Sequence, residues 1–120
     1  MKKLSGSSAI YLQIQHYFET EIASGRLSPG TKIDSIRALA VEFSVNPNTI
    51  QKSLLELERD DLLVTDRTNG KFVTEDENII KALKIKLEKD LVQNFVRQSQ
   101  SLGIEKNKII EIINESWEEN

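Results

Sequence analysis

The chain has 120 residues, enough for one domain or for a small domain with an appended element. It has no cysteine, which excludes a disulfide framework and a thiolate metal site. The formal net charge is −3, and acidic residues outnumber basic ones both in 1–75 (ten against nine) and in 76–120 (nine against seven). A generic nucleic-acid binder is usually basic, so any DNA binding must depend on a local basic surface. No apolar run could span a membrane and the N-terminus lacks a signal-peptide pattern, so we expect a cytoplasmic protein without membrane contact.

The first part of the chain predicts two helices. Residues 9–24 carry apolar side chains at three- and four-residue steps, which is typical of a helix with one buried face. Gly25 is a suitable end for this helix. After a glycine- and proline-rich turn, Asp34 or Ser35 caps a short helix over 36–43.

The next stretch, 45–57, begins with a marked helix start. Asn46 is a favoured N-cap, and Pro47 suits the first helical position, where a missing N–H costs nothing. Apolar residues then recur at helical spacing, while the first turn carries the polar side chains of Asn48, Thr49, Gln51 and Lys52. Major-groove reading requires a polar, exposed helix start of this kind, although an ordinary amphipathic helix with a solvated face has the same pattern.

Two short β-prone runs follow, at 62–65 and 71–74, and the residues between them end in Asn-Gly, the strongest short hairpin signal. Two helices joined by a short turn, with a polar start on the second, make a helix-turn-helix, and a hairpin directly after it makes a winged helix. The tip of this wing would carry side chains that reach phosphates or the minor groove: Arg67, Thr68, Asn69 and Lys71.

From residue 76 the composition changes, and two more helices are predicted, to about 101 and over about 105–118. Both carry wide apolar stripes, which two helices cannot bury well against each other. The remaining surface needs the winged helix or a second copy of the chain, and we favour a homodimer. Its interface would contain Ile80, Leu83, Leu87, Leu91, Phe95, Ile109, Ile113 and Trp117.

The residues do not indicate an enzyme. The chain has one histidine, His16, no phosphate-cradling glycine loop and no carboxylate set in an evident pocket. A metal site at His16 is not expected, because nothing else resembles a ligand set. We therefore expect no cofactor.

A dispersed set of residues keeps one order and spacing: Gly25-x-Leu27-x-Pro29-Gly30-x-x-Ile33-x-Ser35-x-Arg37-x-Leu39-Ala40, Val45-Asn46-Pro47-Asn48-Thr49-Ile50, Leu54-x-x-Leu57-Glu58, Leu62-Leu63 and Gly70-x-Phe72-Val73. With this set the chain resembles the GntR family of bacterial transcription regulators over about 10–74. The Asn-Pro-Asn-Thr start and the short tail most resemble the YtrA-like subgroup. Four positions depart from the family pattern. The family usually has proline at the position of Asp34, glycine at the positions of Ser44 and Asp61, and a further glycine near Thr68.

The resemblance implies a mainly α fold with a small β-hairpin: a winged helix-turn-helix DNA-binding domain over 1–75 and a two-helix dimerisation or effector segment over 76–120. The expected DNA-binding residues are Ser35, Arg37, Asn46, Asn48, Thr49, Gln51, Lys52, Arg67, Thr68, Asn69, Gly70 and Lys71. Pro47 stands where many relatives have a base-reading arginine, so base reading would depend mainly on Asn48, Gln51 and Arg37. The basic side chains of Lys52, Arg67 and Lys71 would then contact phosphates.

We therefore expect a dimeric, sequence-specific repressor that binds a near-palindromic double-stranded operator, with half-sites about one helical turn apart. The resemblance implies control of a transporter operon. Release from DNA would come from an unidentified small-molecule effector or from abundance alone. The alternative is a winged helix used for protein–protein contact, which the acidic balance supports. DNA binding is favoured if Arg37, Lys52, Arg67 and Lys71 share a face from which Asp34, Asp60 and Asp66 point away.

Overall fold

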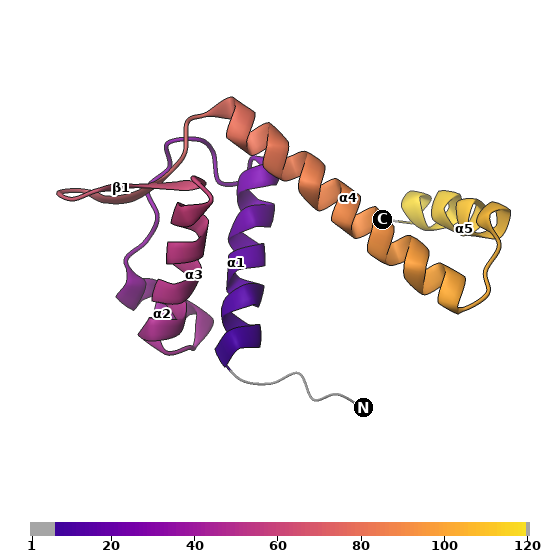
Figure 1. Cartoon of the computed structure of the whole chain (residues 1–120), viewed down its shortest axis with the longest axis horizontal. Coiled ribbons are helices and arrows are strands. Elements are labelled where there is room, and N and C mark those ends of the chain that lie inside the picture. Colours follow the sequence, from indigo (N-terminus) through magenta and orange to yellow (C-terminus); the bar gives the residue numbers. More distant parts are fainter. Residues whose placement is uncertain (1–6, 120) are drawn as a thin grey trace. The chain divides into compact units, whose positions relative to one another are not determined.

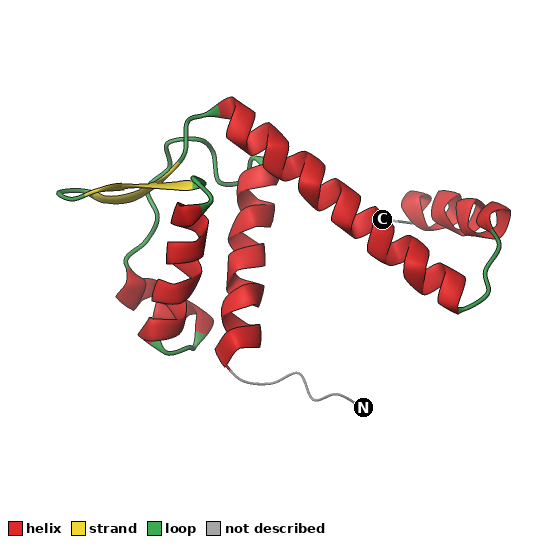
Figure 2. Cartoon of the chain, viewed as in Figure 1, coloured by secondary structure: helices red, strands yellow, loops and turns green. Residues whose placement is uncertain are grey.

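The structure is a computed structural model that describes residues 7–119. Five helices and one two-stranded antiparallel sheet make up this part of the chain (Figure 1, Figure 2). In chain order they are α1 (Ser7–Ser24), α2 (Ile36–Phe43), α3 (Pro47–Arg59), β1 (Leu63–Asp66), β2 (Gly70–Val73), α4 (Glu77–Ser101) and α5 (Lys106–Glu118). The predicted mainly α fold with a small β-hairpin is confirmed.

The chain forms two compact units, which are described separately: unit 1 is Met1–Ile85 and unit 2 is Lys86–Asn120. Helix α4 begins in unit 1 and ends in unit 2. The predicted boundary between residues 75 and 76 is a boundary between functions, and it differs from the boundary between the two compact units. The functional boundary stays a prediction.

The core of unit 1 lies between its first three helices. Helices α1 and α2 both pack against α3, and Figure 1 shows α1 beside α3. The rings of Tyr17 and Phe43 meet edge to face, with centroids 5.3 Å apart, and so join α1 to α2. The buried apolar side chains are Ile14, Phe18, Ile22, Ile33, Leu39, Ala40, Ile50, Leu54, Leu57, Leu62, Leu63, Val73 and Leu83. Ile10 and Tyr17, at the edges of the predicted α1 stripe, stay exposed.

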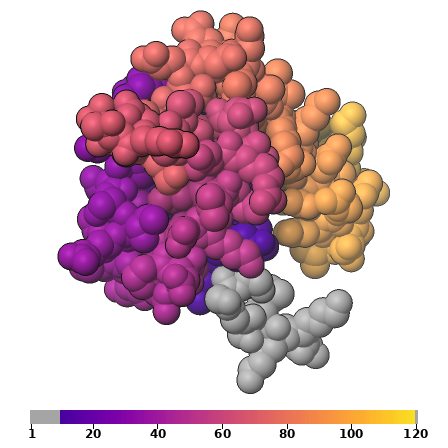
Figure 3. Space-filling model, turned by 60° about the vertical axis from the view of Figure 1, so that its left-hand side comes forward, coloured from indigo at the N-terminus to yellow at the C-terminus, as the bar shows by residue number. Residues whose placement is uncertain are grey.

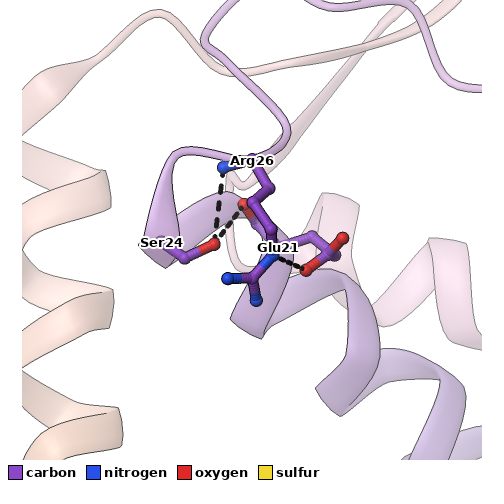
Figure 4. A network of polar contacts seen from close by, with 3 residues as sticks. All are labelled: Glu21, Ser24 and Arg26. Atoms are coloured by element: carbon purple, nitrogen blue, oxygen red, sulfur yellow. Dashed lines mark hydrogen bonds and ion pairs between the residues drawn. The ribbon is translucent and has the colours of Figure 1, made fainter. Parts of the chain in front are cut away.

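Glycine ends α1 at the predicted position. Gly25 has a φ of +84°, in the left-handed region that favours glycine. Next to it, Glu21, Ser24 and Arg26 form a small polar network (Figure 4). The Ser24 hydroxyl donates to the Glu21 carbonyl at 3.2 Å, and the Arg26 guanidinium pairs with the Glu21 carboxylate. These contacts close the C-terminal end of α1 on its exposed side.

Helices α2 and α3 begin where their capping residues predict. The Ser35 hydroxyl accepts the Ala38 N–H at 3.1 Å, and the Asn46 side-chain oxygen accepts the Asn48 N–H at 2.8 Å. Between the helices, Ser44 is left-handed at φ 55° and ψ 47° and turns the chain sharply. This short connection makes α2 and α3 a helix-turn-helix.

The hairpin after α3 is a wing with a three-residue loop. Asp66 pairs with Gly70 at the last rung, and Arg67–Asn69 connect the strands. Each strand is displaced by one residue from its predicted range, so the Asn-Gly pair falls partly in the loop and partly in β2. A bridge between Lys32 and Phe72 adds a third short segment to the sheet. The helix-turn-helix with this wing confirms the predicted winged fold.

Two positions where the family pattern has glycine keep a left-handed backbone without it. Ser44 has a φ of 55° and Asp61 a φ of 61°. A Cβ in this region costs roughly 1–2 kcal/mol, although aspartate tolerates it better than most residues. The fold therefore keeps both turns at a small energetic cost.

Unit 2 consists of the end of α4, a glycine turn and α5. Gly103 has a φ of +75°, and the Ile104 N–H donates to the Ser99 carbonyl at 3.1 Å, which closes the end of α4. Much apolar surface is exposed here, including Leu91 (71%) and Trp117 (80%). Within residues 7–119, none of the helices combines the length and the apolar character that a membrane crossing needs.

The residues predicted for the dimer interface differ in exposure. Leu91, Phe95, Ile113 and Trp117 are exposed, while Ile80, Leu87 and Ile109 are half-buried. Leu83 is the exception, because it is only 8% exposed and belongs to unit 1. Its burial within its own chain leaves little side-chain surface for a second copy.

Candidate nucleic-acid interface

The start of α3 presents a polar, exposed turn. Asn46 and Pro47 set its first residues, and the side chains of Asn48, Gln51 and Lys52 are exposed while Thr49 is half-buried. The same helix buries Ile50, Ser53, Leu54 and Leu57 on its other side. One face of α3 is thus fixed in the core while the predicted reading face stays open to solvent.

Two contacts to α1 hold this helix in place. The Ser53 side chain is fully buried, and the single hydrogen of its hydroxyl is shared between two carbonyl oxygens, those of Tyr11 at 2.8 Å and of Thr49 at 3.1 Å. The Lys52 ammonium lies over the Tyr11 ring, 4.1 Å from its centroid. Tyr11 therefore supports both the buried and the exposed side of α3, a role that sequence reasoning missed.

The start of α2 contains a capping serine and an exposed arginine. Ser35 is committed to capping the helix, but its hydroxyl is exposed and keeps a donor for a phosphate. Arg37 is exposed, and within residues 7–119 its guanidinium has no hydrogen-bond or ion-pair partner. Arg37 is therefore available to an external partner.

The wing tip is ordered by an aspartate at its base. One Asp66 carboxylate oxygen accepts the N–H groups of Thr68 (2.9 Å) and Asn69 (3.3 Å), and the other accepts the Asn69 amide at 3.1 Å. These bonds, led by the one from the Thr68 N–H, lower the pKa of Asp66 below its ordinary value. They also explain the displaced strands: the predicted strands leave five residues, 66–70, between them, whereas the Asp66 bonds close a loop of three, so that Asp66 and Gly70 join the strands.

Lys71 is paired inside the protein. Its ammonium lies 2.7 Å from the Glu58 carboxylate, in the last turns of α3, and 2.9 Å from the Thr65 hydroxyl on β1. The hydrogen bond from Lys71, followed by that from Thr65, lowers the pKa of Glu58. A contact from Lys71 to a phosphate would have to replace this pair.

A groove joins the start of α2 to the wing. It has a volume of about 580 Å³ and is lined by Lys32, Ile33, Asp34, Ser35, Ile36, Leu54, Asn69, Gly70 and Lys71. It brings together four predicted DNA-binding residues from two distant parts of the sequence: Ser35, Asn69, Gly70 and Lys71. Figure 3 shows the surface of this region, with the wing above α2 and α3.

The charges of the predicted DNA-binding residues and of the aspartates near them are mixed. Arg37, Lys52 and Arg67 are exposed, whereas Lys71 is neutralised by Glu58. Asp66 is directed into its own loop, but Asp34 lines the groove and is not turned away from it. Lys71 and Asp34 thus depart from the condition set for DNA binding, and the shared face of the other cations stays a prediction.

Sequence reasoning also missed two residues of this region, Glu58 and Lys32. Glu58 stands in the family-like Leu57-Glu58 pair, which marks the position without showing its partner. Lys32 follows the Pro-Gly turn, and no local signal places it beside the wing, where its side chain passes close to Gly70.

Comparison with known proteins shows that the chain matches a family model and several bacterial regulators. The family model "Bacterial regulatory proteins, gntR family" matches residues 10–73. The chain is 37% identical to the uncharacterized HTH-type transcriptional regulator YhcF of Bacillus subtilis, over 91% of this chain and 90% of YhcF. It is 31% identical to the HTH-type transcriptional repressor YtrA of the same organism, over 91% of this chain and 85% of YtrA.

A solved structure extends the likeness beyond the winged helix. A GntR family transcriptional regulator from Listeria monocytogenes superimposes with a TM-score of 0.83 at 39% sequence identity. The match covers 96% of this chain and 98% of the other, so it includes the two C-terminal helices.

Proposed function

Because the chain belongs to the gntR family of bacterial regulatory proteins, whose members are DNA-binding transcriptional regulators and not enzymes, we propose that it is a dimeric repressor of a near-palindromic operator. The observation that carries the proposal is the joint exposure of the α3 start, Arg37 and the wing tip on one winged helix. The name of YtrA, a transcriptional repressor, supports the direction of control. Its site of action is the bacterial cytoplasm, where the chromosome lies.

In this proposal the start of α3 enters the major groove. Asn48 and Gln51 present amides that pair bidentately with adenine, and Arg37 presents a guanidinium that pairs with guanine. Thr49 and Asn46 support the same turn at the edge of the groove. The open reading face of α3 favours this docking.

Phosphate contacts fix the register of the protein on the duplex. The proposed contacts are Ser35 and Lys52 next to the helix-turn-helix, and Arg67, Thr68, Asn69 and Gly70 on the wing. Lys52 is held by Tyr11 and not by a carboxylate, so its charge is not neutralised. Gly70 allows the wing backbone to approach the DNA closely.

The dimer would form through unit 2. A hollow of about 670 Å³ between the end of α4 and α5 is lined by Leu91, Val92, Phe95, Ile112, Ile113, Ser116 and Trp117. Exposed apolar surface of this kind favours association with a second copy. Two copies would present two reading helices to half-sites about one helical turn apart, or a multiple of one turn. A transporter operon as target and a small-molecule effector are further parts of the proposal, supported by the resemblance to YtrA-like regulators alone.

Selection of bound duplexes from a random pool tests the proposal. We expect an enriched, near-palindromic consensus whose half-site spacing fits a dimer. Arg37→Ala should then weaken binding of the selected duplex by about 1–3 kcal/mol and relax one consensus position. Arg59→Ala is the matched control, because Arg59 is also an exposed arginine but pairs with Glu56 near the other end of α3.

The second candidate is a winged helix that binds another protein. The Lys71–Glu58 pair and the place of Asp34 in the groove favour it, since both weaken the positive potential beside the wing. A pool that yields no enriched duplex would support this candidate and refute the repressor, whereas an enriched duplex that the Arg37 and Arg59 variants bind equally well would remove Arg37 from the DNA-binding site.

A further inference from the structure

One ion pair joins the end of the reading helix to the wing. Glu58 lies in the last turns of α3, and Lys71 is the second residue of β2. Their charged groups are 2.7 Å apart, and the same ammonium donates to Thr65 on β1 at 2.9 Å. The side chains of Lys71 and Glu58 are 23% and 34% exposed, so the pair is partly shielded from water.

The hairpin needs an external hold. Its two strands have four residues each, and an isolated two-stranded hairpin is marginally stable in water. Backbone bonds secure its base, where the Ile33 N–H donates to the Lys71 carbonyl at 2.8 Å and the Val73 N–H donates to the Thr31 carbonyl at 2.9 Å. The residues of α3 also pack against β1, and the Glu58 contact adds a charged side-chain link from α3 to β2.

Lys71 gains little by leaving this site for a phosphate. An ammonium has three donors, and two of them already meet Glu58 and Thr65. Moving away would break a short charge-assisted bond and leave the Glu58 carboxylate without its cation beside DNA, where the phosphates would repel it. The geometry suits a fixed structural link better than a mobile contact.

We propose that Glu58 is a positioning residue for the wing, and that it acts through Lys71 to hold the hairpin at a set place relative to the start of α3. Lys71 then raises operator affinity by geometry and makes no phosphate contact of its own. The effect on operator affinity rests on the proposed DNA binding. The ordering of the wing by Glu58 does not, because it is a property of the free protein.

Salt dependence separates a structural link from a phosphate contact. Each phosphate neutralised by a protein cation contributes about 0.9 to the slope of log affinity against log salt. In the proposed role, Lys71→Gln weakens binding and leaves the slope unchanged. Lys52→Gln is the matched control, because Lys52 has no acidic partner within residues 7–119 and should lower the slope by about 0.9.

The experiment measures affinity for the duplex selected from the random pool, at several salt concentrations. Glu58→Gln and Lys71→Gln should each weaken binding about two- to fivefold, as expected for a partly exposed ion pair, and the double variant should be no worse than either. The charge-reversed pair, Glu58→Lys with Lys71→Glu, should recover most of the loss. If Glu58→Gln tightens binding, if Lys71→Gln lowers the slope by about 0.9, or if the reversed pair binds worse than both single variants, the proposal is overturned.

A measurement on the free protein distinguishes failure of this inference from failure of the proposed function. Glu58→Gln should accelerate amide hydrogen exchange across the β1–β2 rungs while exchange in α1 stays unchanged. Unchanged exchange in the wing would refute the positioning role even if the protein binds DNA. Faster exchange in a protein that selects no duplex would keep the positioning role and refute the repressor.

Discussion

Replacing Ser53 by alanine should destabilise unit 1 by about 0.5–1 kcal/mol. The serine is fully buried, and its hydroxyl hydrogen is shared between the Tyr11 carbonyl of another helix and, at a longer distance, the Thr49 carbonyl of its own helix. A buried hydrogen bond contributes about 1 kcal/mol net, and the bond within the helix adds little. The substitution also stabilises unit 1 by up to about 0.5 kcal/mol, because alanine is a better helix former than serine.

The matched control is Ser99→Ala. Ser99 is also buried in a helix, but its hydroxyl donates only within that helix, to the Phe95 carbonyl at 2.8 Å. Both variants gain the same helix propensity, so the difference between them isolates the bond from α3 to α1. Ser99→Ala should therefore be neutral or slightly stabilising.

The chain offers separate signals for the two units in thermal unfolding. Its single tryptophan, Trp117, lies in unit 2, and both tyrosines, Tyr11 and Tyr17, lie in unit 1. Ser53→Ala should lower the midpoint of the tyrosine signal by about 2–8 °C and leave the tryptophan signal in place. An unchanged tyrosine midpoint, or an equal shift in Ser99→Ala, would show that the hydroxyl does not hold the two helices together.

Three further predictions concern other parts of the chain. Leu91→Glu should convert a dimer to a monomer in sedimentation at micromolar concentration, because it places a charge on the exposed apolar face of unit 2, and a variant that stays dimeric would put the interface elsewhere. Asp66→Asn should lower the midpoint of unfolding at neutral pH. Since the folded pKa of Asp66 is lowered, this loss of stability is present in full above the ordinary pKa of about 4, shrinks as the pH falls below it and vanishes below the lowered folded pKa; a difference between the two midpoints that persists there would refute the role of the charge. Ser44→Gly should keep or raise stability and Ser44→Val should lower it by about 1–2 kcal/mol, since the backbone there is left-handed; equal midpoints for the two variants would contradict this.

The sequence predicts the helix starts well because capping is local chemistry. Ser35 and Asn46 make the hydrogen bonds that their positions indicate, and α2 begins and ends at the predicted residues. The hairpin was predicted with each strand one residue out of place. The reason is also local, since the Asp66 carboxylate closes a three-residue loop, which is shorter than the five residues left between the predicted strands.

The parts that the sequence could not predict depend on distant contacts. The bond from Ser53 reaches a carbonyl 42 residues earlier, and the helical spacing that places Ser53 on the apolar face of α3 does not show this partner. Similarly, Lys71 and Lys52 cannot be distinguished by residue type, but Lys71 pairs with a carboxylate and Lys52 lies over an aromatic ring. Only the fold decides which lysine keeps an unneutralised charge.

The net charge of −3 is a poor guide to the charge that DNA would meet, because several acidic groups are committed to the fold. Asp66 closes the wing loop, Asp76 accepts the N–H groups at the start of α4, and Glu58 is paired with Lys71. Arg37 and Arg67 have no such partner within residues 7–119. A winged helix with an acidic total therefore still has exposed cations, Arg37 and Arg67, that are free for the proposed DNA contacts. Asp34 opposes them from the groove, so Asp34→Asn is the substitution from which we expect tighter operator binding.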